Sequence, residues 1–393
     1  MLEDRKILVA VTGGIAAFKA ISLCSMLKKQ GAEVRVILTD NALRFVSPLS
    51  FSAITRHPVA TTLWKENGEI PHIDLADWAD IIVIAPATAN IIAKCAHGIA
   101  DDLLSSTFLA VTGPVLFVPA MNVHMLENPA TQANLALLKQ RGCFTIEPEH
   151  GILACGYEGK GRYPENEEIL YYIRAYLQYT RDWAGKKVMI TAGACRESID
   201  PMRYISNRSS GKMGLALARA ASIRGAEVTL ITADVTEIIP AYLPAIKVSS
   251  AAEMYDACLK SYSNHELVIM AAAVSDYRPT YEQKSKIKKG ENLQLELVRT
   301  KDIISEMAQK KNDGQIICGF AAESENIIEY AREKMLRKGL DCIIANNLKV
   351  AGAAATNCHF ISPSLEMELS GDKFDVALQI LDLLKTIGGD NDD

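Results

Sequence analysis

Apolar and polar positions follow two patterns along this chain: short β-branched runs, and longer segments with helical periodicity. Strands separated by helical segments are typical of parallel sheets with helices on both faces, so the pattern predicts an α/β fold. In the first half we expect strands at residues 6–13, 34–40, 81–86, 115–120 and 144–148. A helix is expected between the first two strands, packed on the sheet through Phe18, Ile21, Cys24 and Leu27.

The same pattern begins again after a helical segment at residues 171–182. The sequence WAGKKVMITAG repeats the lysine, apolar strand and glycine turn that open the chain, so a second domain begins near Gly185. The predicted domains are residues 1–182 and 185–387. Strands of the second domain are expected at residues 187–193, 228–233, 267–274, 316–322 and 342–347. The segments LQLELV and HFISPSLEMELS are expected to pair antiparallel.

One sequence fragment occurs twice. GAEVRVILTD at residues 31–40 recurs as GAEVTLITAD at residues 225–234, each time after an amphipathic helical segment. Two similar nucleotide-binding units in tandem explain the recurrence. Repeated use of a common turn, in which Gly ends the helix before a strand, explains it equally well.

The composition is that of a globular protein with two sizeable domains: 393 residues, 49% hydrophobic and 23% charged. The 42 basic and 47 acidic residues give a net charge of −5, so we expect neither nucleic acid nor an anionic membrane as partner. Nine scattered cysteines without a CxxC pair argue against a disulfide framework or a structural zinc site, and favour the cytoplasm. No export signal is expected from the acidic first residues. Prolines and a glycine within residues 103–121 exclude a membrane-spanning helix there.

Small and polar residues follow the predicted strands of the first half, namely Gly13, Gly14, Thr39, Asp40 and the segments 86–90 and 119–122. In open α/β sheets, ligands bind beyond the carboxyl ends of the strands. Small residues admit a planar ligand, while hydroxyls, amides and helix N-termini suit a phosphate. Because GGIAAF lacks the GxGxxG fingerprint, a mononucleotide fits better than a dinucleotide. The same residues also form ordinary turns, and that interpretation stays open.

A Ser- and Gly-rich loop with the sequence RYISNRSSGKMG opens a helical segment in the second half. Its N–H groups can bind an anion, although it is not a Walker A loop because Met213 follows Lys212. Further on, Lys284, Lys286 and Lys288 alternate, so an extended conformation directs three ammonium groups to one side, as a triphosphate requires. An edge strand protected by lysines explains the same alternation.

Nine motifs in succession give a more specific indication: VTGGIAAFKA, PHIDLADWAD, APATANIIAKCAHGIADDLL, FVPAMN, ACGYEGKGR, RYISNRSSGKMG, AAAVSDYRP, KIKK and GFAAES. In order and spacing they resemble the bifunctional bacterial phosphopantothenoylcysteine decarboxylase/phosphopantothenate–cysteine ligase of coenzyme A synthesis, over nearly the whole chain. The resemblance implies two tandem Rossmann-like doubly wound domains. The first is flavodoxin-like, of the FMN-dependent cysteine decarboxylase type, and the second is of the ligase type.

For the first domain, the resemblance implies that FMN oxidises the cysteine thiol of phosphopantothenoylcysteine. Carbon dioxide then leaves from a thioaldehyde, and the enethiolate is protonated and reduced to give phosphopantetheine. His72 matches the active-site histidine, placed to act as base on the thiol or to orient the carboxylate. Asn122 matches a carboxylate-binding residue, and Cys155 matches a proton donor on a Gly-rich flap. A surface histidine, a turn-forming asparagine and a small buried cysteine are the alternatives. The implied FMN cradle comprises Gly13, Gly14, Thr39, Thr88 and Asn90.

For the second domain, the resemblance implies that CTP, with Mg²⁺, activates phosphopantothenate as an acyl-cytidylate, from which the amine of cysteine displaces CMP. Asn207 matches the residue that stabilises the acyl-cytidylate, and Arg203 lies on the same loop. The alternative roles are helix capping for Asn207 and a surface ion pair for Arg203. For Lys334 and Lys338, which are named next, the alternative is a solvated helix face. The implied nucleotide contacts are Ala273, Asp276, Lys286, Asp302, Ile303, Phe320, Lys334 and Lys338. Asp276 is a candidate for Mg²⁺ or the base edge, but no complete metal-ligand set is predicted.

The resemblance also implies a large homo-oligomer, a dodecamer assembled from trimers of the first domain and dimers of the second. Four positions depart from the family pattern, namely Ala194, Cys195, Lys301 and Asn347. These departures bear on nucleotide choice more than on the class of reaction. Cys195 is either a participant in the site or an incidental thiol.

Two other functions are compatible with parts of the sequence. A nicotinamide-dependent oxidoreductase is suggested by two nucleotide-type units and by Asp40 after the second strand, but both halves lack GxGxxG. A flavoprotein binding module with a regulatory partner is the other alternative, since flavodoxin-like folds also serve without catalysis.

Overall fold

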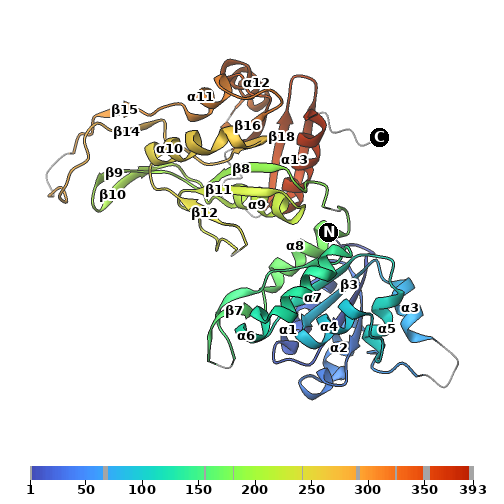
Figure 1. The fold of residues 1–393 in the computed structure, drawn as a ribbon. Coiled ribbons are helices and arrows are strands. Elements are labelled where there is room, and N and C mark those ends of the chain that lie inside the picture. The colour runs from blue at the N-terminus through green and yellow to red at the C-terminus, as the bar shows by residue number, and fades with distance from the viewer. Residues whose placement is uncertain are drawn as a thin grey trace. The chain divides into compact units, whose positions relative to one another are not determined.

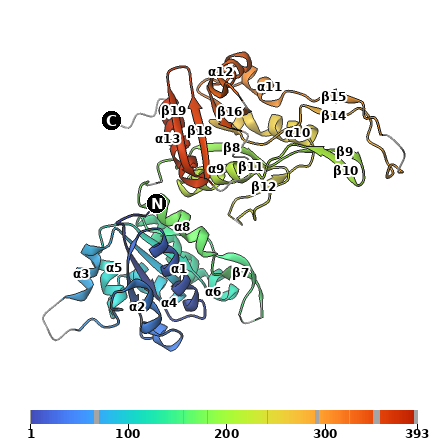
Figure 2. The same ribbon diagram turned by 180° about the vertical axis from the view of Figure 1, so that it is seen from behind.

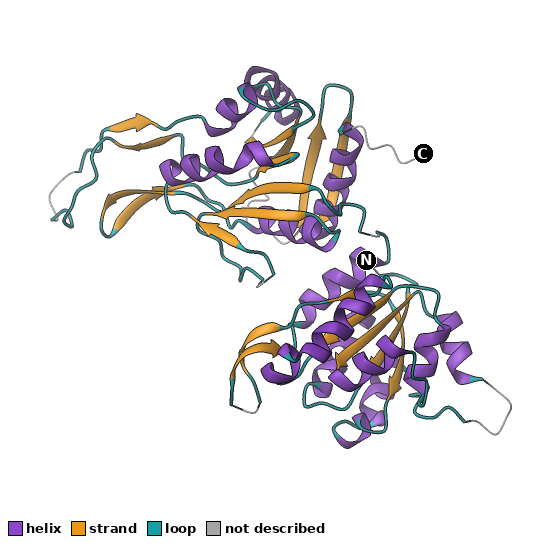
Figure 3. Ribbon diagram, viewed as in Figure 1, coloured by secondary structure: helices purple, strands orange, loops and turns teal. Residues whose placement is uncertain are grey.

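The computed structural model describes residues 2–64, 70–154, 156–179, 181–240, 242–288, 293–323, 325–347 and 355–388. The chain folds into two compact units, Met1–Tyr179 and Thr180–Asp393 (Figure 1). The boundaries expected from the sequence, 182 and 185, lie a few residues beyond this division. Each unit has its own sheet with helices packed against it (Figure 3).

Unit 1 is built on a five-stranded parallel sheet with the order β2-β1-β3-β4-β5. This order, 2-1-3-4-5, is that of flavodoxin-like folds, so the predicted fold class is confirmed. The central strands β1 and β3 are almost continuously buried, as expected for a sheet covered on both faces. The strands are β1 (Lys6–Val11), β2 (Glu33–Leu38), β3 (Ile81–Ala87), β4 (Val115–Pro119) and β5 (Phe144–Thr145).

Eight α-helices of unit 1 lie within the described residues, together with an antiparallel hairpin outside the main sheet. The hairpin consists of β6 (Glu149–Ile152) and β7 (Glu158–Arg162). The helices are α1 (Ala17–Lys29), α2 (Pro48–Thr55), α3 (Pro71–Trp78), α4 (Ala89–His97), α5 (Leu103–Ala110), α6 (Val123–Glu127), α7 (Pro129–Gln140) and α8 (Asn166–Tyr176).

The face that α1 turns to the sheet differs in part from the prediction. Cys24 and Leu27 are buried as expected, but Phe18 is 58% exposed and Ile21 is only partly buried. The buried stripe includes Ala17 and Ala20 instead. Their small side chains let the helix approach the sheet closely, and a phenylalanine at the neighbouring position is turned outward.

Unit 2 contains an eight-stranded sheet with the order β12-β11-β8-β13-β16-β17-β18-β19. Its first six strands are parallel and follow the order 3-2-1-4-5-6 of a doubly wound Rossmann-like sheet, which confirms the prediction. β18 and β19 add antiparallel at one edge, as expected from HFISPSLEMELS. The strands are β8 (Lys187–Ala192), β11 (Glu227–Thr232), β12 (Ala245–Lys247), β13 (Leu267–Met270), β16 (Ile316–Glu323), β17 (Cys342–Asn347), β18 (Ala355–Ile361) and β19 (Glu366–Asp372).

Two antiparallel ribbons extend from the sheet of unit 2, at the end opposite its last helix in both views (Figures 1 and 2). One ribbon pairs β9 (Arg196–Asp200) with β10 (Arg203–Ser206), and the other pairs β14 (Tyr277–Pro279) with β15 (Leu297–Arg299). β9 and β14 contact each other, so the ribbons lie side by side. The helices of unit 2 are α9 (Lys212–Ile223), α10 (Ala251–Ser261), α11 (Ile303–Gln309), α12 (Ile327–Lys338) and α13 (Lys373–Ile387).

A buried arginine joins the start of unit 2 to its last helix. Arg224 is 2% exposed and donates hydrogen bonds to Asp182 at 2.9 and 2.5 Å and to the carbonyl oxygen of Leu378 at 3.2 Å. It also pairs with Asp382 of α13 at 2.7 Å. Among the described residues, the eight cysteines are free thiols, and no helix has the length and apolar character needed to cross a membrane.

Candidate active sites of the two units

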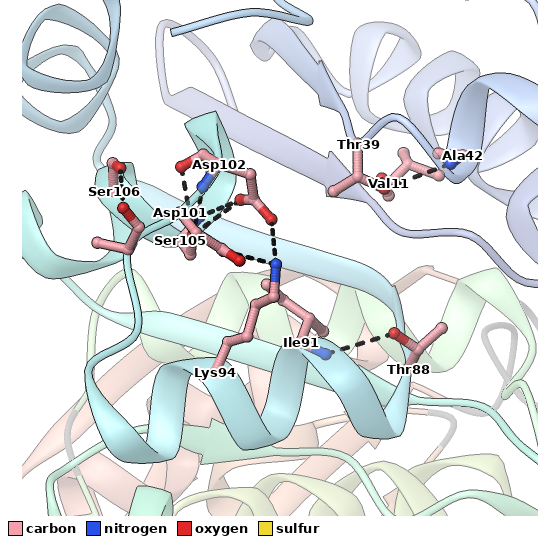
Figure 4. Close-up of polar contacts among 11 residues, drawn as sticks. Val11, Thr39, Ala42, Thr88, Ile91, Lys94, Asp101, Asp102, Ser105 and Ser106 are labelled. Carbon is pink, nitrogen blue, oxygen red and sulfur yellow. Dashed lines mark hydrogen bonds and ion pairs between the residues drawn. The ribbon is translucent and has the colours of Figure 1, made fainter.

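The carboxyl ends of β1, β2 and β3 meet at one edge of the sheet in unit 1. Thr39, after β2, donates its hydroxyl to the carbonyl oxygen of Val11 at 3.4 Å and accepts the N–H of Ala42 at 3.3 Å (Figure 4). Thr12 joins the ends of β1 and β3: its hydroxyl donates to the carbonyl oxygen of Pro86 at 2.7 Å and accepts the N–H of Thr88 at 3.1 Å. Sequence reasoning missed Thr12, because only the fold brings Pro86 and Thr88 next to it.

The two glycines after β1 differ in the space around them. A Cβ at Gly13 would lie 2.4 Å from Cβ of Asn41, so only glycine fits there. A Cβ at Gly14 would lie 3.7 Å from Cγ2 of Thr88, which is ordinary contact. The backbone after β1 is therefore packed tightly on the loop after β2, and the strand ends that carry Gly13, Gly14, Thr39 and Thr88 lie at this one edge of the sheet.

Helix α4 starts at this edge. Thr88 is its N-cap and accepts the N–H of Ile91 at 3.5 Å, while Asn90 is exposed in the first turn (Figure 4). One turn later, Lys94 pairs with Asp101 at 2.6 Å and with Asp102 at 2.9 Å. Burial favours a lower pKa for Lys94, but these two carboxylates hold its pKa above the usual range.

The acidic partner of Lys94 also organises the next helix. Asp102 is the N-cap of α5 and forms a reciprocal capping box with Ser105. Burial favours a higher pKa for Asp102, but hydrogen bonds with Lys94 and Ser105 hold its pKa below the usual range. The motif KCAHGIADDLL therefore fixes the connection between α4 and α5, which supports the helix that carries Thr88 and Asn90.

His72 and Asn122 are not brought together within one chain. His72 lies on α3 and is partly buried; its Nδ1 is buried, and no hydrogen-bond partner for it is present among the described residues. Asn122 precedes α6 and accepts the N–H of His124 at 2.9 Å as the helix N-cap. In both views, α3 lies on the opposite side of unit 1 from α6 and β7 (Figures 1 and 2).

The hairpin of β6 and β7 packs on the segment that carries Asn122. The N–H of Met121 donates to the carbonyl oxygen of Gly161 at 3.1 Å. Gly161 has a φ of +146°, and a Cβ there would lie 2.2 Å from the oxygen of Met121. The glycines of the predicted flap therefore permit close packing against residues 121–123. Cys155 lies outside the described residues, between the two strands of this hairpin.

In unit 2, a cavity of about 760 Å³ lies at the carboxyl ends of β13 and β16. Its lining includes five basic and two acidic side chains, a composition that attracts a polyanion. Lys301, one of the departures from the family pattern, is among the basic ones. Six of the eight expected nucleotide contacts line this cavity: Asp276, Asp302, Ile303, Phe320, Lys334 and Lys338.

Two lysines of α12 are directed into this cavity wall. The Nζ of Lys338 lies 2.9 Å from Oδ2 of Asp302, and Lys334 donates to the carbonyl oxygen of Phe320 at 3.1 Å. Both lysines are partly buried, so the solvated-face interpretation is wrong. Burial favours a higher pKa for Asp302, but hydrogen bonds from Lys338 and from the N–H of Ser305 hold its pKa below the usual range.

Asn207 lies against the same cavity wall. Its Nδ2 donates to the carbonyl oxygen of Val274, a lining residue, at 3.0 Å. The N-cap of α9 is Gly211, so the helix-capping interpretation of Asn207 is wrong. Ala273 contacts the strand-end loop through its backbone, with its N–H donating to the carbonyl oxygen of Gly193 at 2.8 Å.

Arg203 and Lys286 belong to two segments that meet at the ribbons. The guanidinium of Arg203 lies 3.1 Å from Asp200, whose side chain is fully buried, and also donates to the carbonyl oxygen of Ile287 at 3.4 Å. The pair of Arg203 is therefore not a simple surface ion pair. Residues 281–288 form an exposed loop and no strand, so the interpretation of the alternating lysines as an edge strand is wrong.

Two of the other three departures from the family pattern, Cys195 and Ala194, lie in the described part of unit 2. Cys195 is buried, which raises the pKa of its thiol to about 12, so it is not a reactive thiolate. Ala194 forms isolated bridges with Asp234 and Ala273. The side chain of Asn347 lies outside the described residues. Within the described part of the chain, no three His, Cys, Asp or Glu residues gather as a metal site.

Both units match known families. A model of the DNA/pantothenate metabolism flavoprotein C-terminal domain matches residues 183–387, and a model described as flavoprotein matches residues 1–178. The coenzyme A biosynthesis bifunctional protein CoaBC of Bacillus subtilis (strain 168) is 48% identical over 393 residues, which are 97% of this chain and 97% of that protein. The protein of the same description from Escherichia coli (strain K12) is 42% identical over 353 residues, 88% of this chain and 87% of its own.

Two solved structures resemble the separate units. The C-terminal domain of a coenzyme A biosynthesis bifunctional protein CoaBC is 35% identical, with a TM-score of 0.48, and covers 54% of this chain and 100% of its own. The FMN-dependent cysteine decarboxylase SpaF is 32% identical, with a TM-score of 0.40, and covers 45% and 97%.

A flavodoxin-like flavoprotein unit is thus followed by a Rossmann-like unit with a cation-lined cavity. The chain belongs to the family of coenzyme A biosynthesis bifunctional proteins CoaBC. It is an enzyme with phosphopantothenoylcysteine decarboxylase and phosphopantothenate–cysteine ligase activities, which confirms the function expected from the motifs. The oxidoreductase alternative has no support in these matches.

Proposed function

We propose that unit 2 uses CTP and Mg²⁺ to join phosphopantothenate to cysteine, and that unit 1 uses FMN to decarboxylate the product. The ligase reaction is supported by the cavity of about 760 Å³, which is lined by five basic and two acidic side chains. An excess of cations in a partly enclosed cavity stabilises the charge of a triphosphate and of the pyrophosphate that leaves.

In the ligase reaction, an oxygen of the phosphopantothenate carboxylate attacks the α-phosphorus of CTP and pyrophosphate leaves. The amine of cysteine then attacks the acyl carbon, an amide forms, and CMP leaves. Lys334 and Lys338 are placed to neutralise phosphate oxygens, and Asp276, also in the cavity wall, is the candidate for Mg²⁺ or the base edge. The amide of Asn207, beside Val274, is placed to donate a hydrogen bond to the acyl-cytidylate.

In unit 1, the strand-end residues are proposed to hold FMN: Gly13, Gly14, Thr39, Thr88 and Asn90. The close packing of Gly13 on Asn41 supports this, because it holds the loop after β1 against the loop after β2, where Thr39 lies. FMN supplies the electron acceptor that makes loss of carbon dioxide possible. Among the described residues the Nδ1 of His72 has no hydrogen-bond partner, and it is proposed to exchange a proton with the substrate. Asn122 is proposed to hold the substrate carboxylate, and Cys155 to return a proton.

The separation of His72 from Asn122 supports a homo-oligomer. Because α3 and α6 lie on opposite sides of unit 1, a site that uses both residues takes them from two copies of the chain. We propose trimers of unit 1, joined through dimers of unit 2 into a dodecamer. The free thiols are those of a protein in a reducing compartment, which supports a cytoplasmic location.

Subunit mixing tests the shared decarboxylase site. His72→Gln and Asn122→Ala homo-oligomers should each lack decarboxylation with flavin still bound. Mixed oligomers, formed by dissociating and reassembling both variants together, should regain activity, because some interfaces then pair two intact residues. Separately reassembled variants are the controls. Absence of recovery in verified mixed oligomers would contradict the shared site.

For the ligase, Asn207→Asp tests the assigned amide. A carboxylate in place of the amide repels the anionic acyl-cytidylate, so amide formation should fall strongly while decarboxylation of supplied phosphopantothenoylcysteine is unchanged. Normal amide formation in this variant would remove Asn207 from the proposed site.

A further inference from the structure

A buried carboxylate stands at the junction of the two segments that carry Arg203 and Lys286. Asp200 ends β9, and its side chain has no exposed surface. Its two oxygens accept from different groups. Oδ1 accepts the N–H of Met202 at 2.8 Å and of Arg203 at 2.9 Å, which are contacts within the local turn. Oδ2 accepts the N–H of Ile287 at 3.1 Å and lies 3.1 Å from Nη1 of Arg203.

The contacts of Oδ2 join parts of the chain that are 87 residues apart. Arg203 closes the same junction from the other side, because Nη1 also donates to the carbonyl oxygen of Ile287 at 3.4 Å. Ile287 directly follows Lys286. Because both the N–H and the C=O of Ile287 are hydrogen-bonded, the backbone next to this lysine is held in place. An independent hydrogen bond, from the N–H of Gln283 to the carbonyl oxygen of Ile199 at 3.0 Å, attaches the start of the same loop to β9.

The chemistry of Asp200 suits a holding role. A buried carboxylate is stable only when its lone pairs accept hydrogen bonds, and here four N–H groups supply them. Burial favours a higher pKa for this carboxyl, but the backbone N–H groups of Met202, Ile287 and Arg203 hold its pKa below the usual range. Asp200 thus stays ionised and oriented at neutral pH.

We infer that Asp200 is a positioning residue of the ligase: through Oδ2 it holds the guanidinium of Arg203 and the loop of Lys286 in one fixed arrangement. This inference rests on the proposed ligase function and on the assignment of Arg203 and Lys286 to its site, which the sequence resemblance implies. The loop of residues 281–288 is exposed and has no strand pairing, so without the Oδ2 contacts Lys286 samples many positions before it meets the nucleotide. Ordering it beforehand removes that entropy from binding.

Asp200→Asn separates the two oxygens. An amide keeps one acceptor but replaces the other with an NH₂ donor, so in either orientation two of the four N–H groups face a donor. If the remaining oxygen stays toward Met202 and Arg203, the turn is kept and only the junction to Ile287 is lost. The attachment through Gln283 remains, so the fold of the ribbon is expected to persist. Asp256→Asn, an exposed carboxylate on α10, is the matched control.

The measurement is steady-state ligase kinetics of the full-length holoenzyme, with CTP varied at saturating phosphopantothenate and cysteine. For Asp200→Asn we expect KM for CTP to rise at least about tenfold, as loss of a hydrogen bond to a charged group allows, with kcat changed by less than about threefold. Decarboxylation of supplied phosphopantothenoylcysteine by the same preparation should be unchanged, as should both activities of Asp256→Asn. A KM within about twofold of the parent, or a loss confined to kcat, would overturn the positioning role.

Two further variants test the contact between Asp200 and Ile287 and the assignment of Lys286 separately. Ile287→Pro removes the N–H that Oδ2 accepts while Asp200 is intact, so it should also raise KM for CTP, and less than additively when combined with Asp200→Asn. Additive effects would refute a shared junction. Lys286→Ala tests the underlying assignment: if it leaves KM for CTP unchanged, the assignment of Lys286 fails. If Lys286→Ala raises KM and Asp200→Asn does not, only the positioning role fails.

Discussion

The charge balance of the ligase cavity gives a sharp prediction at Lys338. Its side chain is 19% exposed, and its Nζ lies 2.9 Å from Oδ2 of Asp302 in the cavity wall. Lys338→Met keeps most of the side-chain volume but removes the ammonium. The cavity then loses one of its five cations and exposes the charge of Asp302 to the incoming nucleotide.

The size of the effect follows from these contacts. Two unit charges about 4 Å apart interact by about 4 kcal/mol at the effective dielectric of a protein surface. Because solvent reaches part of Lys338 and the neighbouring cations remain, we take about half of this value as the loss of binding free energy for CTP. A loss of about 2 kcal/mol corresponds to a KM for CTP about thirtyfold higher.

A double-mutant cycle isolates the interaction with Asp302. In Lys338→Met with Asp302→Asn, the unpaired carboxylate is gone, so much of the affinity for CTP should return, with a coupling energy of at least about 1 kcal/mol. The assay is ligase kinetics with CTP varied, and Lys260→Met on the exposed end of α10 is the control. An unchanged KM in Lys338→Met, or strictly additive single effects, would refute this account of the cavity.

Three further predictions concern stability and the flavin unit. Arg224→Met leaves Asp182 and Asp382 without their buried cation, so calorimetry should show the transition of unit 2 about 5–10 °C lower, and an unchanged transition would refute the clamp. Gly13→Ala places a Cβ 2.4 Å from Asn41, so flavin titration should give binding at least about tenfold weaker; equal affinity would contradict the cradle. The depressed pKa of Asp102 adds stability that is present above its unfolded pKa of about 3.9 and is lost as pH falls through the folded value. Lys94→Met should therefore be less stable than the parent near neutral pH but lose less thermal stability as pH falls through this range; an equal acid-side loss in the two proteins would contradict the pairing.

The strands and both sheet types could be predicted because the apolar runs are long and β-branched. KILVAV and IIVIAPA leave little choice other than buried parallel strands, and the structure has them at β1 and β3. The face that α1 buries was predicted wrongly in part. A periodicity argument treats Phe18 as the natural core residue, whereas the sheet accepts the small side chains of Ala17 and Ala20 and leaves Phe18 exposed.

The candidate sites were predictable where a motif carries its own contacts, and not where the fold creates them. Asp276, Phe320 and Lys334 could be named from the resemblance, and they line one cavity. Asp200 could not, because its decisive partner, Ile287, is 87 residues away. The lysine alternation at 284–288 suggested a strand, but the segment is held by its backbone at Ile287 and not by strand pairing.

The separation of His72 from Asn122 was also beyond the sequence. Both residues belong to motifs of one domain, and nothing in their spacing shows that α3 and α6 lie on opposite sides of the unit. This separation is the reason for the proposal that two copies of the chain complete each decarboxylase site.

Product analysis by mass spectrometry tests the central claim most directly. The purified full-length protein with bound FMN is given phosphopantothenate, cysteine, CTP and Mg²⁺, and a parallel reaction omits CTP. The account predicts phosphopantetheine, CMP, pyrophosphate and carbon dioxide in the complete reaction, and none of these products without CTP. Accumulation of phosphopantothenoylcysteine alone would contradict the proposed flavin site, and formation of the amide without CTP would contradict the proposed role of the cation-lined cavity.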